Sequence, residues 1–149
     1  MLALLLLNGC EAPLVLDGIS EQRLQPIRRT DNIIAITQTQ ETLVAVGTNG
    51  LILTSAKSPL KWTRQIVDSS SNFVDISTCP DQSLIALTTE RGVWHSKDHG
   101  KQWRKIQLNT QENVISLTCA PDNSFWISAS FSTIIHSKDG GETWQENSL

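Results

Sequence analysis

The stretch that decides the fold is SKDGGETW, which runs from Ser137 to Trp144 near the C-terminus. A second copy, SKDHGKQW, runs from Ser96 to Trp103, and a degenerate copy, SAKSPLKW, runs from Ser55 to Trp62. The serines and the tryptophans of the three copies are each spaced 41 residues apart. A fixed period of about 40 to 45 residues indicates a repeat architecture, and propeller blades have this length.

Each repeat unit contains four short segments with β-type composition. In the second unit they are NFVDIS, SLIALT, GVWHS and WRKIQL, and turn residues separate them. Four antiparallel strands per 41 residues make one propeller blade. We therefore predict an all-β, propeller-like fold with three four-stranded blades at about residues 32–68, 72–109 and 113–149, within a repeat region 32–149. Propellers usually have four to eight blades, so the prediction is an incomplete or partner-completed propeller.

The repeated stretch is suited to a tight hairpin between the third and fourth strands. Glycine supplies the positive φ angle of such a turn, and an aspartate carboxylate accepts main-chain N–H bonds within it. The tryptophan begins the outer strand and packs on the sheet. In the first unit Lys57 replaces the aspartate and Pro59 the glycine, so that turn must close differently. The residues assigned to these structural turns are Ser55, Trp62, Ser96, Asp98, Gly100, Trp103, Ser137, Asp139, Gly141 and Trp144.

The pattern Ser-x-Asp-x-Gly-x-x-Trp resembles the Asp-box, or bacterial neuraminidase (BNR) repeat. The fuller phrase VAVGTNGLILTS, followed by Trp62, resembles the repeat of the photosystem II stability and assembly factor family and its relatives in non-photosynthetic bacteria. The resemblance covers Asn32 to Leu149. It implies a β-propeller that is often exported and sometimes lipid-anchored, and that acts as a non-catalytic scaffold for protein binding or complex assembly.

Catalysis is not expected. A sialidase needs a tyrosine nucleophile, and the chain has no tyrosine. A glucanase needs two facing carboxylates, but Asp81 and Asp122 are repeat-equivalent Pro-Asp turn residues. His95 and His136 are also repeat-equivalent, which favours a structural position over a metal site. No catalytic residue, metal or cofactor is predicted; the alternatives are a fragment of a sialidase- or glucanase-like hydrolase, or a truncated product without independent function.

The net charge of −3 argues against nucleic-acid binding. We expect a protein partner or self-association instead. Eight of the twelve basic residues lie in or beside the repeated turns. They either line one binding face for an acidic partner or anionic headgroups, or are simply charged because turns are exposed. They are Lys57, Lys61, Arg64, Lys97, Lys101, Arg104, Lys105 and Lys138.

The first ten residues, MLALLLLNGC, resemble the end of a signal peptide with a bacterial lipobox. This predicts an exported protein, periplasmic or membrane-anchored, with a lipid on Cys10 after cleavage. No Lys or Arg precedes the short apolar run, so a chance apolar N-terminus or a buried strand is the alternative. If Cys10 is the mature N-terminus, residues 11–31 would be a tether, a cap or part of an outer strand. The outer strand is an option because QRLQPI (22–27) falls one period before TRQIV (63–67).

The other two cysteines, Cys79 and Cys119, are one position out of phase in the repeat. An exported compartment permits a disulfide. However, successive strand residues point to opposite faces. The spacing therefore favours two small, buried apolar side chains over a bridge.

Overall fold

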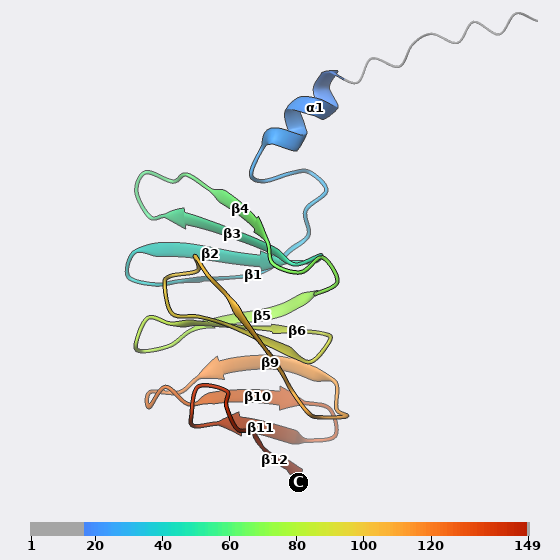
Figure 1. Cartoon of the computed structure of the whole chain (residues 1–149), viewed down its shortest axis with the longest axis vertical. Helices are drawn as coiled ribbons and strands as arrows, with labels where there is room; N and C mark the ends of the chain where they lie inside the picture. The colour runs from blue at the N-terminus through green and yellow to red at the C-terminus, as the bar shows by residue number, and fades with distance from the viewer. Residues whose placement is uncertain (1–16, 149) are drawn as a thin grey trace, which may run out of the picture.

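The computed structural model describes residues 17–148, so the lipobox-like segment that ends at Cys10 lies outside the described residues. Three four-stranded antiparallel sheets, here called blades 1, 2 and 3, follow one another along the chain (Figure 1). Blade 1 contains β1 (Ile33–Gln38), β2 (Thr42–Gly47), β3 (Leu51–Ala56) and β4 (Thr63–Ile66). Blade 2 contains β5 (Phe73–Thr78), β6 (Leu84–Thr88), β7 (Gly92–Ser96) and β8 (Arg104–Gln107). Blade 3 contains β9 (Val114–Cys119), β10 (Phe125–Ala129), β11 (Thr133–Ser137) and β12 (Gln145–Ser148). The predicted all-β fold of three antiparallel blades is confirmed.

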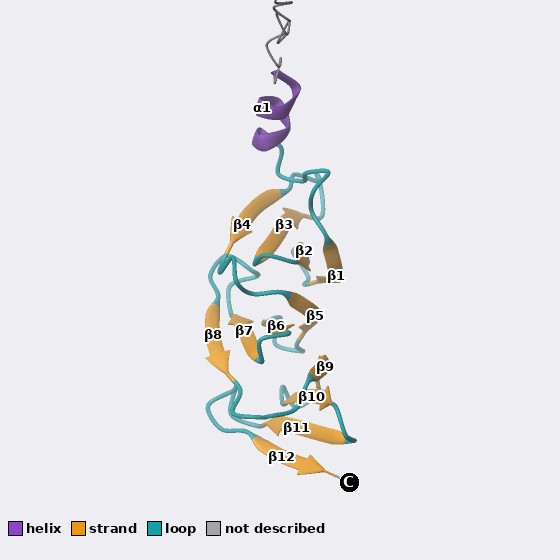
Figure 2. Cartoon of the chain, turned by 90° about the vertical axis from the view of Figure 1, so that its right-hand side faces the viewer, coloured by secondary structure: helices purple, strands orange, loops and turns teal. Residues whose placement is uncertain are grey.

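The blades stack with their first strands side by side. β1, β5 and β9 follow one another along one side of the stack, and β4 and β8 run along the opposite side (Figure 2). Thr37 Oγ1 of β1 lies 2.9 Å from Thr78 Oγ1 of β5. The Asp75 carboxylate of β5 accepts hydrogen bonds from Ser116 Oγ and from the Leu117 N–H of β9, at 2.7 and 2.9 Å. Radially repeated four-stranded sheets of this kind are the blades of a β-propeller.

Antiparallel pairing gives the stack two different ends. The end that carries the turns between strands one and two and between strands three and four is here called the serine end, because Ser55, Ser96 and Ser137 lie there. The opposite end, the linker end, carries the turns between strands two and three and the linkers between blades. Main-chain bonds join these segments: the Gly50 N–H donates to the Ser71 carbonyl and the Leu108 N–H to the Arg91 carbonyl.

The hydrophobic core lies between the blades. One buried cluster joins blades 1 and 2, and a second joins blades 2 and 3. Every residue of β6 and β7 is buried, because blade 2 is covered on both of its faces. The β-branched and leucine side chains of the second and third strands thus form two apolar layers rather than one, as in the interior of a propeller.

A disulfide joins Cys79, which directly follows β5, to Cys119, the last residue of β9. The sequence-based preference for two unpaired thiols was therefore wrong. The offset of one repeat position does not separate the sulfurs, because Cys79 has already left its strand and β5 lies beside β9. The two Cα atoms are 5.1 Å apart. The bond ties blade 2 to blade 3.

The described chain before blade 1 contains a helix, α1 (Asp17–Leu24), where an outer strand was one alternative. The outer strand of a blade pairs with the third strand of the same blade, and the part of the chain described before β1 contains no such strand. The segment after α1 binds β4 instead. The Arg64 guanidinium donates to the Asp31 carboxylate at 2.7 and 2.9 Å and to the Pro26 carbonyl at 3.2 Å. The Asp31 side chain is only 5% exposed, so this ion pair is largely shielded from water.

Candidate functional site

The turn between β7 and β8 is closed by side chains of the repeated stretch. Ser96 Oγ accepts a hydrogen bond from the Gly100 N–H at 2.9 Å and donates one to Asp98 at 2.8 Å. Asp98 also accepts from the N–H groups of Lys101 and of the next residue, at 3.1 and 2.8 Å. Trp103 Nε1 donates to the Gly100 carbonyl at 3.0 Å. Gly100 has a φ of 89°, a conformation that disfavours residues with a Cβ atom.

The turn between β11 and β12 repeats this arrangement. Ser137 Oγ accepts from the Gly141 N–H at 2.9 Å and donates to Asp139 at 2.8 Å. Trp144 Nε1 donates to the Gly141 carbonyl at 3.1 Å. Hydrogen bonds from the hydroxyl and N–H of Thr143, followed by that from Ser137, lower the pKa of Asp139 to about 2. The carboxylate is therefore ionised at neutral pH and already occupied by its own turn.

The turn of blade 1 lacks the aspartate and is closed mainly by Ser55. Ser55 Oγ accepts from the Lys61 N–H at 2.8 Å and donates to the Ala56 carbonyl at 2.9 Å. Trp62 packs against a small cluster that includes Leu51 and Leu53. The serine and the tryptophan thus keep their places where the middle of the turn has changed.

Two adjoining hollows open at the serine end. The first, of about 400 Å³, is lined by His95, Lys97, Asp98, Gln102, Trp103 and Arg104. The second, of about 260 Å³, shares His95 and Lys97 with the first and reaches between blades 2 and 3. Its remaining lining residues come from the turns between the first and second strands of blades 2 and 3, from the start of β10 and from the β11–β12 turn. They are Asp81, Ser83, Asp122, Asn123, Phe125, Lys138, Asp139 and Gly140. The two hollows together are here called the His95 groove.

His95 lies at the centre of this groove. It is 6% exposed, and its ring meets the Phe125 ring edge-on at a centroid distance of 5.2 Å. Its Nε2 atom is buried without a hydrogen-bond partner among the described residues. Burial, together with the charges of Lys97 and Arg104, lowers the pKa of His95, and the Asp81 charge opposes this in part. The environment thus favours the neutral imidazole.

Two of the groove aspartates, Asp81 and Asp122, hold turns between first and second strands. Asp81 accepts from Ser83 Oγ at 2.6 Å and from the Ser83 N–H at 3.0 Å, and Asp122 accepts from Ser124 in the same way. Burial would raise the pKa of Asp81, but the Ser83 bonds outweigh it and lower the pKa. The Ser124 hydroxyl lowers the pKa of Asp122. A glycosidase acid needs the opposite shift, so these carboxylates suit structure better than proton donation.

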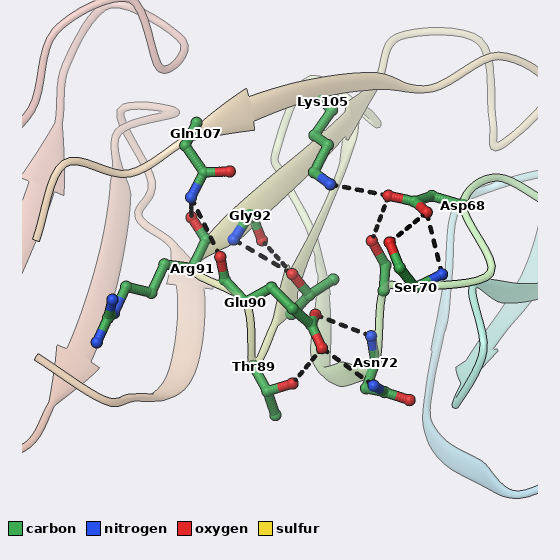
Figure 3. Close-up of polar contacts among 11 residues, drawn as sticks. Asp68, Ser70, Asn72, Thr89, Glu90, Arg91, Gly92, Lys105 and Gln107 are labelled. Atoms are coloured by element: carbon green, nitrogen blue, oxygen red, sulfur yellow. Dashed lines mark hydrogen bonds and ion pairs between the residues drawn. The ribbon is translucent and has the colours of Figure 1, made fainter. Parts of the chain in front are cut away.

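A separate polar cluster secures the linker end between blades 1 and 2 (Figure 3). Lys105 Nζ donates to Asp68 at 2.9 Å and lies 5.5 Å from the centroid of the Trp94 ring. Asp68 also accepts bonds from the hydroxyl and N–H of Ser70 and from the Ser71 hydroxyl. These bonds, with Ser70 the largest contributor and Lys105 next, hold the pKa of Asp68 far below its usual range. The cluster fixes the linker that leads into blade 2.

Glu90 completes this cluster (Figure 3). Its carboxylate accepts from the N–H and side-chain amide of Asn72 at 2.9 and 3.0 Å, and from the Thr89 hydroxyl at 2.7 Å. Desolvation acts to raise the pKa of Glu90, but these bonds outweigh it and lower the pKa to about 2. Gln107 Nε2 donates to the carbonyls of Glu90 and Arg91 at 3.1 Å each. Both carboxylates of the cluster, Asp68 and Glu90, are thus engaged in holding chain segments together.

Six of the eight predicted basic residues lie on the serine-end turns or line the His95 groove, and the other two are held in ion pairs. Arg64 binds Asp31 and Lys105 binds Asp68, as described above, while Arg104 lies 3.0 Å from the exposed Glu142 carboxylate. Lys97 and Lys138 line the His95 groove. The remaining three, Lys57, Lys61 and Lys101, are exposed on the serine-end turns.

Sequence reasoning missed the two ion pairs that hold Arg64 and Lys105. The basic partners occupy equivalent strand positions, one period apart, but the acidic partners, Asp31 and Asp68, do not share a repeat position. A periodicity argument therefore had no signal for the acids. Arg64 and Lys105 are 41 residues apart, and this spacing was the one sign in the sequence that the two side chains have similar surroundings.

Two further properties bear on function. Within residues 17–148, no group of three or more His, Cys, Asp or Glu side chains is placed to hold a metal ion together. No helix in that range combines the length and apolar character needed to cross a bilayer.

No family model and no curated protein matches the sequence. Among solved structures, the chain is similar to YCF48 bound to D1 peptide, with 18% identity and a TM-score of 0.68, over 78% of this chain and 41% of that one. For YCF48 from Cyanidioschyzon merolae the identity is 21% and the TM-score 0.69, over 81% and 38%. For selenomethionine-substituted virginiamycin B lyase from Staphylococcus aureus, the identity is 15% and the TM-score 0.67, over 78% of this chain and 41% of that one. The likeness shows a shared β-propeller fold, and the chain spans about two-fifths of the length of each structure.

Proposed function

We propose that the chain is a non-catalytic β-propeller scaffold that binds a protein partner and supports the assembly of a complex. Its binding site is the His95 groove. One observation carries this proposal: the groove aspartates are bonded within their own turns, whereas other polar side chains are exposed. Lys97, Gln102 and Arg104 are exposed beside the half-buried Trp103. Such a surface offers recognition groups rather than a reacting pair.

Two likenesses support a protein partner. The turns of blades 2 and 3 resemble the Asp-box, and the repeat phrase resembles that of the photosystem II stability and assembly factor family. One solved structure of similar fold, YCF48, has a D1 peptide bound. At 18% identity that structure supports a peptide-binding role for this fold without specifying the peptide for this chain.

The first hollow of the groove suits an acidic peptide, because it is lined by two cations, Lys97 and Arg104, and by one carboxylate, Asp98, which its own turn engages. Lys97 has no carboxylate partner within 4.0 Å among the described residues, and Arg104 pairs with the exposed Glu142 and donates to the Gly140 carbonyl at 3.4 Å. The flat Trp103 ring can stack against a planar side chain or a peptide plane. A carboxylate that binds between these cations would be recognised by charge and by directed hydrogen bonds.

Catalysis is not part of the proposal. Each described carboxyl group whose pKa departs clearly from its ordinary value is shifted downward, among them Asp81, Glu90 and Asp98. A sialidase- or glucanase-like hydrolase needs a proton donor with a raised pKa. The hydrolase-fragment alternative therefore lacks a candidate acid among these groups.

The test is a peptide-binding measurement on the full chain. An array of acidic, neutral and basic peptides of about 12 residues, each with one aromatic residue, is screened, and hits are titrated by tryptophan fluorescence. We expect acidic hits whose Kd rises at least tenfold in Lys97→Glu and Arg104→Glu variants, corresponding to about 1.4 kcal/mol. Lys57→Glu, an equal charge change on the blade 1 turn, is the control and should leave Kd unchanged. Acidic hits that all three variants weaken equally would contradict the groove as the site.

We also propose that the chain is exported and lipid-anchored at Cys10. The lipobox-like segment supports this, and an anchored scaffold would act at a membrane surface. The natural gene product, made in a Gram-negative host, should fractionate with membranes and carry lipid on Cys10 by mass spectrometry, and a Cys10→Ser variant should lose both properties. Wild-type protein that stays in the cytosol with Met1 intact would refute this part of the proposal.

A further inference from the structure

Both internal interfaces of the stack are built in the same way. Each blade has a forward face, which meets the next blade, and a rear face, which meets the preceding one. At the first interface, Val44 on a forward face shares a buried cluster with Ile76 and Leu84 on a rear face, and none of the three is more than 6% exposed. At the second interface, Ile85 takes the place of Val44, while Leu117 and Phe125 take the places of the other two.

The rear face of blade 1 has the same construction and no described blade beside it; the face is open at β1, whereas Ala45, Leu51 and Leu53 on β2 and β3 are no more than 3% exposed. Ile36 pairs with Ala45 across β1 and β2, as Ile76 pairs with Ala86 in blade 2. Ile36 is 60% exposed, whereas Ile76 is 6% exposed. A hollow of about 380 Å³ lies there, lined by Ile36, Leu43 and two polar neighbours. The Asp31–Arg64 pair covers a different part of this face, since Arg64 lies on β4.

The forward face of blade 3 carries a larger side chain at the matching position. Trp126 stands one period after Ile85. It pairs with Thr118 and His136 across the sheet and stacks on the His136 ring at a centroid distance of 4.6 Å and an interplanar angle of 10°. Trp126 is half-buried and lines a hollow of about 180 Å³.

The forward face of blade 3 and the open β1 side of the rear face of blade 1 complement each other in size. If the forward face of blade 3 met the rear face of blade 1 as internal faces meet, Trp126 would lie against Ile36 and Leu43. The indole is larger than the Val44 and Ile85 side chains in the internal interfaces, and Leu43 is smaller than its equivalent Phe125. The extra volume on one face thus matches the hollow on the other, as close packing requires.

The hydrogen bonds between adjacent blades also repeat, and they too indicate that the two outer blades have complementary groups. Gln82 Oε1 accepts from the Gln40 N–H of the preceding blade at 2.6 Å, and Asn123 Oδ1 accepts from the Asp81 N–H at 3.1 Å. One period before Gln82 stands Glu41, whose side chain is 73% exposed. One period after Asp81 stands Asp122. Glu41 therefore presents a carboxylate acceptor where this interface needs one for the Asp122 N–H.

We propose that the rear face of blade 1 binds the forward face of blade 3 of a second copy of this chain, head to tail. The occupant is a second copy because one chain carries both halves of the contact. Blade 3 supplies the tryptophan and the donor, and blade 1 supplies the hollow and the acceptor. Two such contacts close a ring of two copies with six blades, within the range of four to eight found in propellers. The His95 groove lies within one copy, so this inference does not depend on the proposed function.

The test measures the mass of the purified full chain by analytical ultracentrifugation between about 1 and 100 µM. We expect a single species of twice the 16.5 kDa chain mass. Ile36→Lys and Trp126→Glu should each raise the dimer dissociation constant at least tenfold. Phe131→Lys is the matched control, because Phe131 is 83% exposed on the β10–β11 turn at the linker end and should not affect the dimer.

Mixing the two variants makes the test specific for head-to-tail contact. A mixed pair has one contact with unaltered faces and one in which the new lysine opposes the new glutamate. Dimers should therefore form in the mixture at concentrations where neither variant dimerises alone. Any of three results would overturn the proposal: a folded wild-type monomer at 100 µM, higher polymers, or a mixture that stays monomeric. The Glu41→Gln variant keeps the acceptor and removes a charge near Asp122, so it should retain the dimer.

Discussion

The disulfide between Cys79 and Cys119 offers the sharpest test of the structure, because its two sulfurs lie in different blades. It closes a loop with a sequence separation of 40 residues. In the chain-entropy model, cross-linking a loop of that length stabilises a protein by about 4 kcal/mol at 25 °C through the unfolded state. A domain is stable by about 5–15 kcal/mol in all, so the loss would be a large fraction of the total.

The assay is equilibrium unfolding in guanidinium chloride, followed by tryptophan fluorescence, in a Cys10→Ser background that removes the third thiol. Oxidised protein is compared with the same protein under full reduction, which removes the cross-link but keeps both sulfurs in place. We expect a drop of about 4 kcal/mol in the free energy of unfolding. The Cys79→Ala and Cys119→Ala single variants and the double variant should all lose a similar amount, because each lacks the same bond.

Two outcomes would refute this reasoning. One is a difference below about 1 kcal/mol between oxidised and reduced protein, since the loop entropy would then not be at work. The other is alkylation of both cysteines in unreduced, denatured protein, detected by mass spectrometry. In that case the sulfurs would not be bonded, and the contact between β5 and β9 would need revision.

Three further predictions concern single contacts. Arg64→Ala removes the guanidinium from the shielded Asp31 carboxylate, which keeps only its bond from the Arg28 N–H, and should lower the free energy of unfolding by about 3 kcal/mol; an unchanged denaturation midpoint would contradict the ion pair. The pKa of Glu90 falls from 4.5 to about 2 on folding, so its stabilisation is present above pH 4.5 and is lost as the pH falls toward 2. The melting temperature of Glu90→Gln should therefore fall less steeply than that of wild type between these pH values, and parallel profiles would argue against the Glu90 bonds. Trp103→Phe keeps an aromatic ring but removes the 3.0 Å bond to the Gly100 carbonyl, and thermal unfolding should report a loss of about 1 kcal/mol; no loss would mean that water replaces this bond.

The local features of the fold could be predicted from the sequence because their physics is local. The turn of Ser96 to Trp103 is closed by bonds between residues no more than four positions apart, so its serine, aspartate and glycine reveal it directly. The 41-residue spacing then indicates equal blades, since equal units pack in equal ways. The unusual turn of blade 1 was also visible, because Lys57 and Pro59 cannot supply the carboxylate and the flexible glycine.

The contacts between blades could not be predicted in the same way. The Cys79–Cys119 bond, the Asp31–Arg64 pair and the His95 groove all join residues that do not share a repeat position or that meet only after the sheets stack. Periodicity says which positions are equivalent, but the distance between side chains of different blades depends on the twist of the sheets and on the path of the linkers. The sequence alone thus determined the strands, the turns and the number of blades, through hydrogen bonds and patterns within each unit. Which side chains meet between units was decided by the tertiary structure, because the packing of one sheet on another sets those distances.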